Sequence, residues 1–446
     1  MIDFLEQLLL GPNDPNSIVA CSGNSTCSTV HSIVTTLLVF LVLLTGFAYT
    51  TVLERRFISF MQSRIGPNRA GPKGLLQPVS EGVKLIFKEE IIPDGADRAV
   101  YSFAPLLKLV PSLIVLAVVP LGPNVYIPWF DDKWYEMAQG FTDVNVGVLW
   151  LLAVTSISVY GITLAGWASN NKYALLGALR ASASMISYEL SLGTVFAVPI
   201  MLAGSMSIGD IIQEQSGLFF NWFIFQNPLA AIIMFLALMA EISRAPFDMP
   251  EAEQELVAGH ITEYSGMKFA MFFLAEYVNM IGISVIFIMM FMGGYHDGFG
   301  LVAGAPLLAL PILIGKVIPF LIIMIWIRGT IFRPRYDRLM AFGWKVMLPL
   351  SMLAVAWTAV SIVIEQEGGS TAYLISVGIL FVIVAALGYL FNRGTTPETA
   401  LNVDEVEPEK EGLGYYVLQF VGGILSIPFV AYEAAKNLRP GGSAKS

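Results

Sequence analysis

The chain has 446 residues, of which 56% are hydrophobic and only 13% are charged, and its mean hydropathy is +0.69. A soluble domain carries about 25% charged residues, so this composition excludes an ordinary soluble protein and indicates an integral membrane protein. The net charge of −9 argues against a nucleic-acid partner, because no basic face could dominate it. Two cysteines and three scattered histidines are too few for an iron–sulfur cluster, a zinc site built from cysteine alone, a haem or a di-metal centre.

Nine apolar stretches are long enough, or nearly so, to cross a hydrocarbon core that needs about 20 helical residues. They do not alternate with a period of two, so we predict an all-α, polytopic membrane protein with about nine transmembrane helices. A weaker tenth run, 415–432, contains two glycines and a proline and is interpreted as an interfacial or docking segment. In chain order the nine stretches are 33–53, 103–121, 146–168, 184–205, 228–246, 269–292, 305–327, 346–364 and 372–391.

The distribution of lysine and arginine predicts the orientation. The first 30 residues contain neither, so no secretory signal is visible and the first span has to act as the insertion signal. With the N-terminus outside, 23 of the 25 basic residues fall on the cytoplasmic side, the exceptions being Lys133 and Lys316. We therefore predict an outer N-terminus and a cytoplasmic C-terminus. Cys21 and Cys27 then lie outside, either as a surface disulfide or as free thiols.

The first inner loop, 54–73, is basic and rich in glycine and proline, which favour turns. Its end superficially resembles a phosphate-binding loop, but Pro72 separates the glycine from the lysine and no strand precedes it, so we reject a nucleotide site. After Pro78 the apolar residues recur with helical spacing, which predicts an amphipathic helix in the membrane surface. Taken alone, such a helix is more often a basic interfacial anchor. Its position beside this turn-rich basic loop favours a second interpretation, the entrance of a binding site for an amphipathic ligand.

The third inner loop, 240–264, is the strongest local signal. Pro246 ends the fifth helix, because the residue before a proline is disfavoured in a helix. Acidic clusters are usually solvated, but this one is interleaved with apolar residues and flanked by two spans, so we expect part of it to fold back into protein. Crowded, partly desolvated carboxylates can exchange protons near neutral pH. The loop carries one arginine, Arg244, and six acids, Glu241, Asp248, Glu251, Glu253, Glu255 and Glu263.

Charged residues also occur at or within the spans. Each costs about 2.5–3.5 kcal/mol on insertion scales, so each has to face a partner or water. The residues are Glu54, Glu189, Glu241, Glu276 and, near the middle of the seventh span, Lys316. Structural ion pairs between helices are one interpretation. Four acids grouped toward the same leaflet, below an acidic loop, favour a hydrated carboxylate path for protons.

Residues 31–365 resemble the family of the H subunit of proton-pumping NADH:quinone oxidoreductase, respiratory complex I. This is the membrane subunit at the junction with the peripheral arm. The resemblance rests on several motifs that match together. They are ERR at 54–56, RIGPNR at 64–69, KLIFKE at 84–89, KYALLGALR at 172–180, ISYE at 186–189, AEISRAPFD at 240–248, EYSGMK at 263–268, AEY at 275–277 and FRPRYDRLM at 332–340.

The resemblance implies a quinone chamber shared with the peripheral arm and quinone reduction coupled to proton translocation. Electrons would come from a partner's terminal iron–sulfur cluster, so the chain itself would hold no metal, flavin or cluster and would bind ubiquinone or menaquinone as substrate. Small and antiporter-like membrane subunits would be neighbours, in a bacterial inner membrane. The implied chamber residues are Arg55, Arg56, Arg180, Arg244, Asp248, Glu251, Glu253, Glu255 and Arg333. The implied proton pathway contains Glu54, Glu189, Glu241 and Glu276, with Lys316 a less certain member.

The chain departs from the family at both ends. We expect an outer extension over 1–30, a membrane core of eight helices over 31–365, and an additional helix with an inner tail over 366–446. A related membrane subunit of a hydrogenase or another quinone-linked dehydrogenase would have the same spans, and the co-purifying electron donor would distinguish it. A proton-coupled solute transporter should show internal repeats, and none is evident. A purely structural anchor would not need so many charges within its spans.

Overall fold

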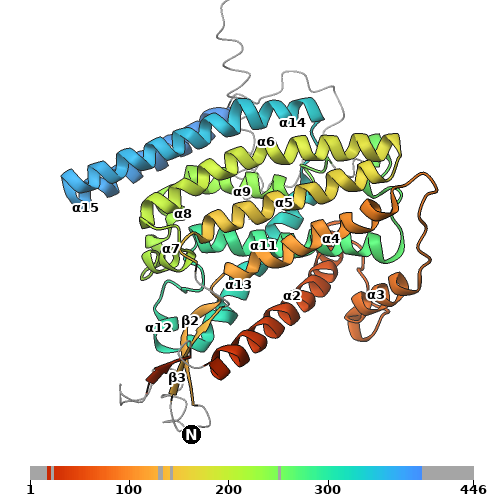
Figure 1. The fold of residues 1–446 in the computed structure, drawn as a ribbon. Helices are drawn as coiled ribbons and strands as arrows, with labels where there is room; N and C mark the ends of the chain where they lie inside the picture. The colour runs from red at the N-terminus through yellow and green to blue at the C-terminus, as the bar shows by residue number, and fades with distance from the viewer. Residues whose placement is uncertain (1–17, 22–24, 129–133, 141–143, 250–252, 394–446) are drawn as a thin grey trace, which may run out of the picture.

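The computed structural model describes residues 18–21, 25–128, 134–140, 144–249 and 253–393, and it is dominated by long, roughly antiparallel helices (Figure 1). The long helices are α2 (Ser25–Met61), α4 (Arg98–Ile114), α5 (Gly147–Ala168), α6 (Lys172–Ala203), α9 (Pro228–Ile242), α11 (Gly266–Phe291), α13 (Ala309–Thr330) and α15 (Leu348–Arg393). Shorter helices are α3 (Gln77–Phe87), α7 (Ile208–Glu214), α8 (Phe223–Gln226), α10 (Glu253–Leu256), α12 (Leu301–Gly304) and α14 (Tyr336–Phe342). Single turns are η3 (Pro72–Gly74), η4 (Val115–Val118), η5 (Phe219–Asn221), η6 (Gly259–Ile261), η7 (Pro306–Leu308) and η8 (Gly343–Met347).

Local sequence explains where several helices begin and end. The Asp97 carboxylate accepts the first amides of α4, and the Asn171 and Asn227 side chains do the same for α6 and α9. Pro228 supplies the first residue of α9, where its missing amide hydrogen costs no helical bond. Gly204 ends α6 in the left-handed conformation that glycine adopts without strain.

The helical, multi-pass prediction is confirmed, but the count of nine spans is not. Within the described residues, seven helices are long and apolar enough to cross a membrane, and Pro228–Ile242 is a shorter apolar helix. Helical backbone continues from Leu348 to Arg393 through both of the last predicted spans, without the loop predicted between them. The weak run at 415–432 lies outside the described residues.

Two helices are longer than predicted, which corrects the positions of several charged residues. Helix α2 extends to Met61, so Glu54, Arg55 and Arg56 are helical rather than part of the first loop. The reason is that no glycine or proline follows the apolar stretch until Gly66. Helix α6 begins at Lys172, so the predicted second loop with Arg180 is helical and Glu189 lies in the middle of this helix.

A small three-stranded sheet, which the sequence analysis did not predict, ties the N-terminal segment to the connection between α4 and α5. Strand β1 (Ile18–Ala20) pairs in parallel with β3 (Trp134–Gln139), which pairs antiparallel with β2 (Gly122–Pro128). Cys21 and Cys27 form a disulfide, which decides between the two alternatives left open by the sequence. The His31 ring contacts the Ala138 carbonyl at 2.9 Å. We call this end of the bundle the sheet end and the opposite one, with α3 and loop 243–265, the loop end (Figure 1).

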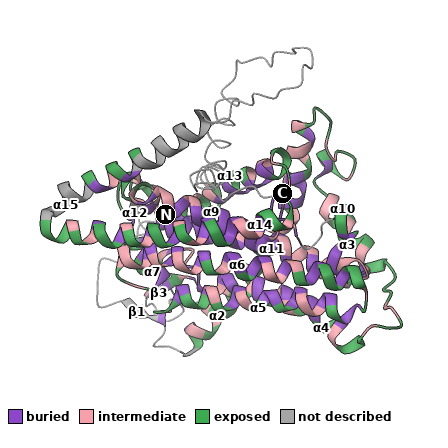
Figure 2. Ribbon diagram, turned by 90° about the horizontal axis from the view of Figure 1, so that it is seen from above, coloured by how far each residue is buried: buried purple, intermediate pink, exposed green. Residues whose placement is uncertain are grey.

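Helix α11 forms the centre of the bundle. In the 18-residue apolar stretch of α11, 72% of the residues are buried, against 6% in that of α2. Figure 2 shows the same contrast in burial. Beside it, α4, α5 and α6 pack closely because small residues face one another. Gly161 on α5 meets the backbone at Lys108 of α4, and Gly166 meets Ala174 and Ala178 of α6.

Replacing Gly166 by alanine should therefore destabilise the α5–α6 contact. The new methyl group would overlap Ala178 Cβ and the Ala174 carbonyl, both on a helix backbone that cannot yield cheaply. Overpacking of this kind costs about 1–3 kcal/mol. We expect a lower thermal midpoint of the assembled protein. Gly193→Ala is the matched control, because nothing lies within 4 Å of its added methyl. Equal midpoints for the two variants would contradict the assignment of this contact.

Candidate functional site

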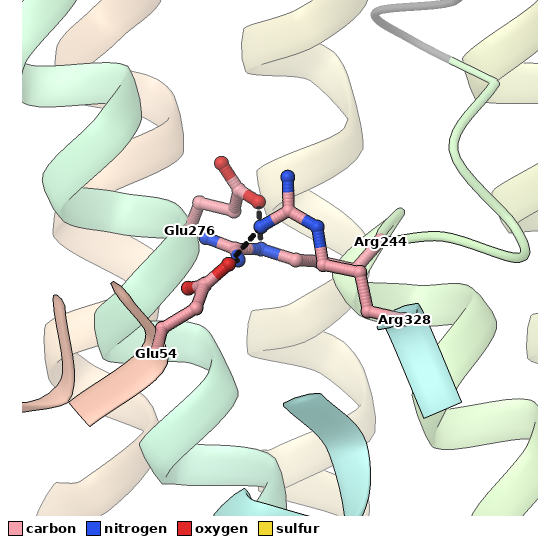
Figure 3. Close-up of polar contacts among 4 residues, drawn as sticks. All are labelled: Glu54, Arg244, Glu276 and Arg328. Atoms are coloured by element: carbon pink, nitrogen blue, oxygen red, sulfur yellow. Dashed lines mark hydrogen bonds and ion pairs between the residues drawn. The ribbon is translucent and has the colours of Figure 1, made fainter. Parts of the chain in front are cut away.

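Four charged residues from four segments meet near the loop end and form what we call the arginine–glutamate cluster: Glu54, Arg244, Glu276 and Arg328 (Figure 3). Arg244 Nη1 donates to both carboxylate oxygens of Glu54 at 2.9 and 2.8 Å, and its Nε donates to Glu276. Arg328 Nη1 donates to Glu54 as well. Glu54 comes from α2, Glu276 from α11 and Arg328 from α13. The Arg244 guanidinium therefore joins α2 to α11 at the turn after α9, and Arg328 adds α13 through Glu54.

The cluster is buried around Arg244 and Glu54 and opens toward Arg328, whose side chain is 39% exposed. The side chains of Arg244 and Glu54 are 7% and 5% exposed, and that of Glu276 is 21% exposed. The Arg244 guanidinium lies 4.2 Å from the centre of the Tyr277 ring. Burial alone would lower the pKa of Arg244, but Glu276 and Glu54 together raise it well above its usual range. Arg244 therefore stays charged and holds two carboxylates in place.

A second group of charges lies deeper between α4, α6 and α9. Glu241 and Lys108 are 2% and 7% exposed, and each is the other's electrostatic neighbour. Glu189 on α6 also acts on Glu241 and accepts a hydrogen bond from Ser156 of α5. Among the described residues, no ion pair within 4 Å includes Lys108, Glu189 or Glu241. These charges are close enough to influence one another but are not locked together.

A cavity of about 40 Å³ lies beside both groups. Its polar wall is formed by Lys108, Ser243, His260 and Glu276, and the remainder is isoleucine and phenylalanine. One water needs about 10–15 Å³ of such space and two or more polar partners, so the cavity has room for a short row of waters. A smaller cavity of about 10 Å³ lies against Arg244 and Arg328 among methionines. Together these features can support a hydrated polar path.

The residues implied for the chamber do not form one group. Arg55 pairs with Glu81 of α3, and Arg56 donates to the Lys73 carbonyl, so both fix the first loop and α3 to the end of α2. Arg244 belongs to the arginine–glutamate cluster. Asp248 is half-buried in loop 243–265. Glu253 begins α10, and Glu251 lies outside the described residues.

Arg180 and Glu255 form a separate pair at the loop end, and Arg333 lies against Met249. Arg180 Nη1 is 2.7 Å from Glu255, and its guanidinium lies 5.6 Å from the Tyr336 ring. Arg333 contacts the Met249 sulfur at 3.9 Å, while its Nε is buried without a hydrogen-bond partner in the described part of the chain. A buried donor of this kind is costly unless something accepts a hydrogen bond from it.

Lys316 does not join the acids. Its amine donates to three backbone carbonyls, those of Met292 at 2.6 Å, Gly294 at 2.9 Å and His296 at 2.5 Å, and lies 4.2 Å from the Trp222 ring. These carbonyls follow the sheet end of α11, 16 residues or roughly 24 Å along that helix from Glu276. Burial and the Lys316 charge lower the pKa of His296, which stays neutral. Lys316 thus caps a buried helix end, where a cation is favoured.

Sequence reasoning missed three members of these groups. Lys108 lies inside the predicted span 103–121 and is recognisable as an intramembrane charge, but it is one of the 23 basic residues that the orientation assigns to the cytoplasmic side. Arg328, at the end of the seventh span, was used for orientation alone. Tyr277 gave no signal of its own, although its helical neighbour Glu276 did.

Comparisons with known proteins agree on one family. The profile described as "NADH dehydrogenase" matches residues 34–359. The second of two H subunits of NADH-quinone oxidoreductase from Geobacter metallireducens is 47% identical over 330 residues, covering 73% of this chain and 93% of its own length. The first H subunit of Geobacter sulfurreducens is 46% identical over 336 residues, covering 74% and 94%. The H subunit of Thermomicrobium roseum is 46% identical over 324 residues, covering 71% and 92%.

Proposed function

Since the chain belongs to the NADH dehydrogenase family, as a relative of the H subunit of NADH-quinone oxidoreductase, we propose that it forms the membrane part of a quinone chamber and couples quinone reduction to proton translocation. It is a multi-pass membrane subunit of an oxidoreductase complex whose substrate is a quinone. In the proposal it carries no electrons. These come from the iron–sulfur cluster of a peripheral subunit, and antiporter-like subunits receive the resulting change in charge.

The loop end supports the chamber. Helix α3 has no buried residue and presents Val79, Ile86 and Phe87, which are 62%, 60% and 84% exposed, beside the end of α2. Such a face lies comfortably in the interface and lets a long isoprenoid substrate approach from the lipid. The Arg180–Glu255 pair and the buried Arg333 Nε provide polar contacts for its head group. The relatives favour this function over the hydrogenase and transporter alternatives.

The coupling proposal rests on two observations. Lys108 and Glu189 both act on the charge of Glu241, and Lys108 lines one cavity with Glu276. Reduction of a quinone to a quinol takes two electrons and two protons, so charge at the chamber changes in each turnover. Buried acids that are not tied to a fixed cation are able to respond to such a change by taking up or releasing a proton. Glu54 and Glu276 meet the arginines and would transmit the change from the loop end.

Replacing Arg333 by Met tests the chamber. We expect the KM for a short-chain quinone to rise at least about tenfold, because a hydrogen bond from a charged group contributes about 1.5–3 kcal/mol. NADH-driven quinone reduction by the purified complex measures it. Arg335→Met is the matched control, since Arg335 is exposed two residues away. An unchanged KM in an assembled Arg333→Met complex would remove Arg333 from the quinone site.

A further inference from the structure

Lys108 is a buried cation that belongs to neither the chamber residues nor the proton pathway implied by the sequence. It lies in the middle of α4 and is 7% exposed. Helix α5 approaches the backbone of Lys108 closely through Gly161, so this side of α4 has no room for the amine to reach solvent. A buried amine is costly unless it is paired or hydrated.

The charged and titratable groups around Lys108 come from three elements. Glu241 of α9 and Glu276 of α11 both act on its charge, and His260 of η6 lies on the same cavity wall. Glu189 of α6 acts on Glu241 in turn. Within the described residues, neither Glu241 nor Glu276 forms an ion pair with the Lys108 amine within 4 Å. Lys316, by contrast, is held by three carbonyls.

The cavity explains how the Lys108 ammonium can be solvated. It has room for a short row of waters, and both Lys108 and Glu276 line it. Glu276 belongs to the arginine–glutamate cluster, whereas Glu241 belongs to the deeper group. Lys108 is thus a buried charge that both groups influence, through Glu276 of the cluster and Glu241 of the deeper group.

We propose that Lys108 is a positioning residue that links the two groups: its ammonium, hydrated in this cavity, makes the charge of Glu241 depend on that of Glu276. A proton gained by one acid weakens its attraction for the ammonium, which then moves toward the other and stabilises its ionised form. The inference rests on the proposed function and adds a member to the coupling path.

The test compares Lys108→Met with Lys108→Arg in the whole complex in vesicles. The pH profile of NADH-driven quinone reduction and the proton yield per electron are measured. Removing the cation favours protonation of the acids, so we expect the acidic limb of the Lys108→Met profile to shift upward by about one pH unit, with a lower proton yield. Lys108→Arg should restore both. Ser112→Ala, one turn along α4 at a buried residue that bonds to its own helix, is the packing control.

An assembled Lys108→Met complex with a wild-type profile and yield overturns the inference. If that variant fails to assemble, Lys108→Arg decides, because a shifted profile in a variant that keeps the charge also overturns it. Glu241→Gln is measured in parallel. If Glu241→Gln impairs coupling while Lys108→Met is normal, the failure is that of Lys108 alone. Wild-type behaviour of Glu241→Gln removes Glu241 from the proposed coupling path itself.

Discussion

Replacing Arg244 by Met is expected to prevent stable assembly of the protein. The substitution leaves Glu54 buried and removes the only contact that Glu276 makes with a cation among the ion pairs of the described residues. Removing one partner from a buried ion pair costs about 3–5 kcal/mol. Here Glu54 would keep only Arg328, whose side chain is 39% exposed, and Glu276 would keep no cation among the ion pairs of the described residues. We expect little or no assembled complex on a native gel, and a thermal midpoint far below that of the wild type for any that forms.

Two further variants show whether charge is the cause. Arg244→Lys keeps a cation but cannot bond to both acids with fixed geometry, so we expect partial recovery. Arg244→Met combined with Glu54→Gln and Glu276→Gln removes the stranded charges and should assemble better than Arg244→Met alone. A triple variant no better than the single one would mean that the packing of Arg244 on Tyr277, rather than its charge, holds this region together.

Replacing Glu241 by Gln is expected to give the second-largest effect, on turnover rather than assembly. Glutamine has nearly the same volume and keeps a polar group at a site that is 2% exposed. It cannot take up or release a proton. If Glu241 exchanges protons during coupling, quinone reduction and proton translocation should both fall, by about a hundredfold for loss of a proton-transferring group. Vesicles with a pH-sensitive dye measure both rates together.

Glu214→Gln provides the control for Glu241→Gln, because Glu214 is an exposed acid on α7 at the sheet end. It should retain the wild-type rates. A Glu241→Gln complex with normal quinone reduction and normal proton yield would exclude Glu241 from the path. Normal reduction with a reduced yield would place Glu241 after the quinone step rather than in control of it.

The helices were predictable because apolar length is a direct consequence of crossing lipid. The residues at which the helices begin and end were less predictable. Helix α6 begins twelve residues before the predicted span, because Lys172 and Arg180 lower the hydropathy of residues 172–183 although these residues are helical. The sheet was missed because β1 has three residues and pairs with a strand more than 100 residues away, a contact that leaves no local pattern.

The candidate site was predictable in its residues but not in its pairings. Each buried acid was recognisable as a charge in an apolar stretch. That Glu54 binds Arg244, 190 residues later, depends on how α2 packs against α11 and α13. Lys316 illustrates the same limit. Its position in a span suggested a functional charge, whereas the end of α11 supplies three carbonyls that account for it.

The sheet also constrains how α2 can move. The disulfide, β1 and His31 fasten the start of this helix to the α4–α5 connection, while ion pairs at Glu54 and Arg55 hold its other end. With 37 residues, α2 is a rod roughly 55 Å long that is anchored at its origin. Because its start is fixed, a small rotation of α2 about that point moves the residues at its far end the most. A small rearrangement of the Glu54 contacts would therefore be expressed as displacement of α3 and the basic loop, while the opposite extremity stays still.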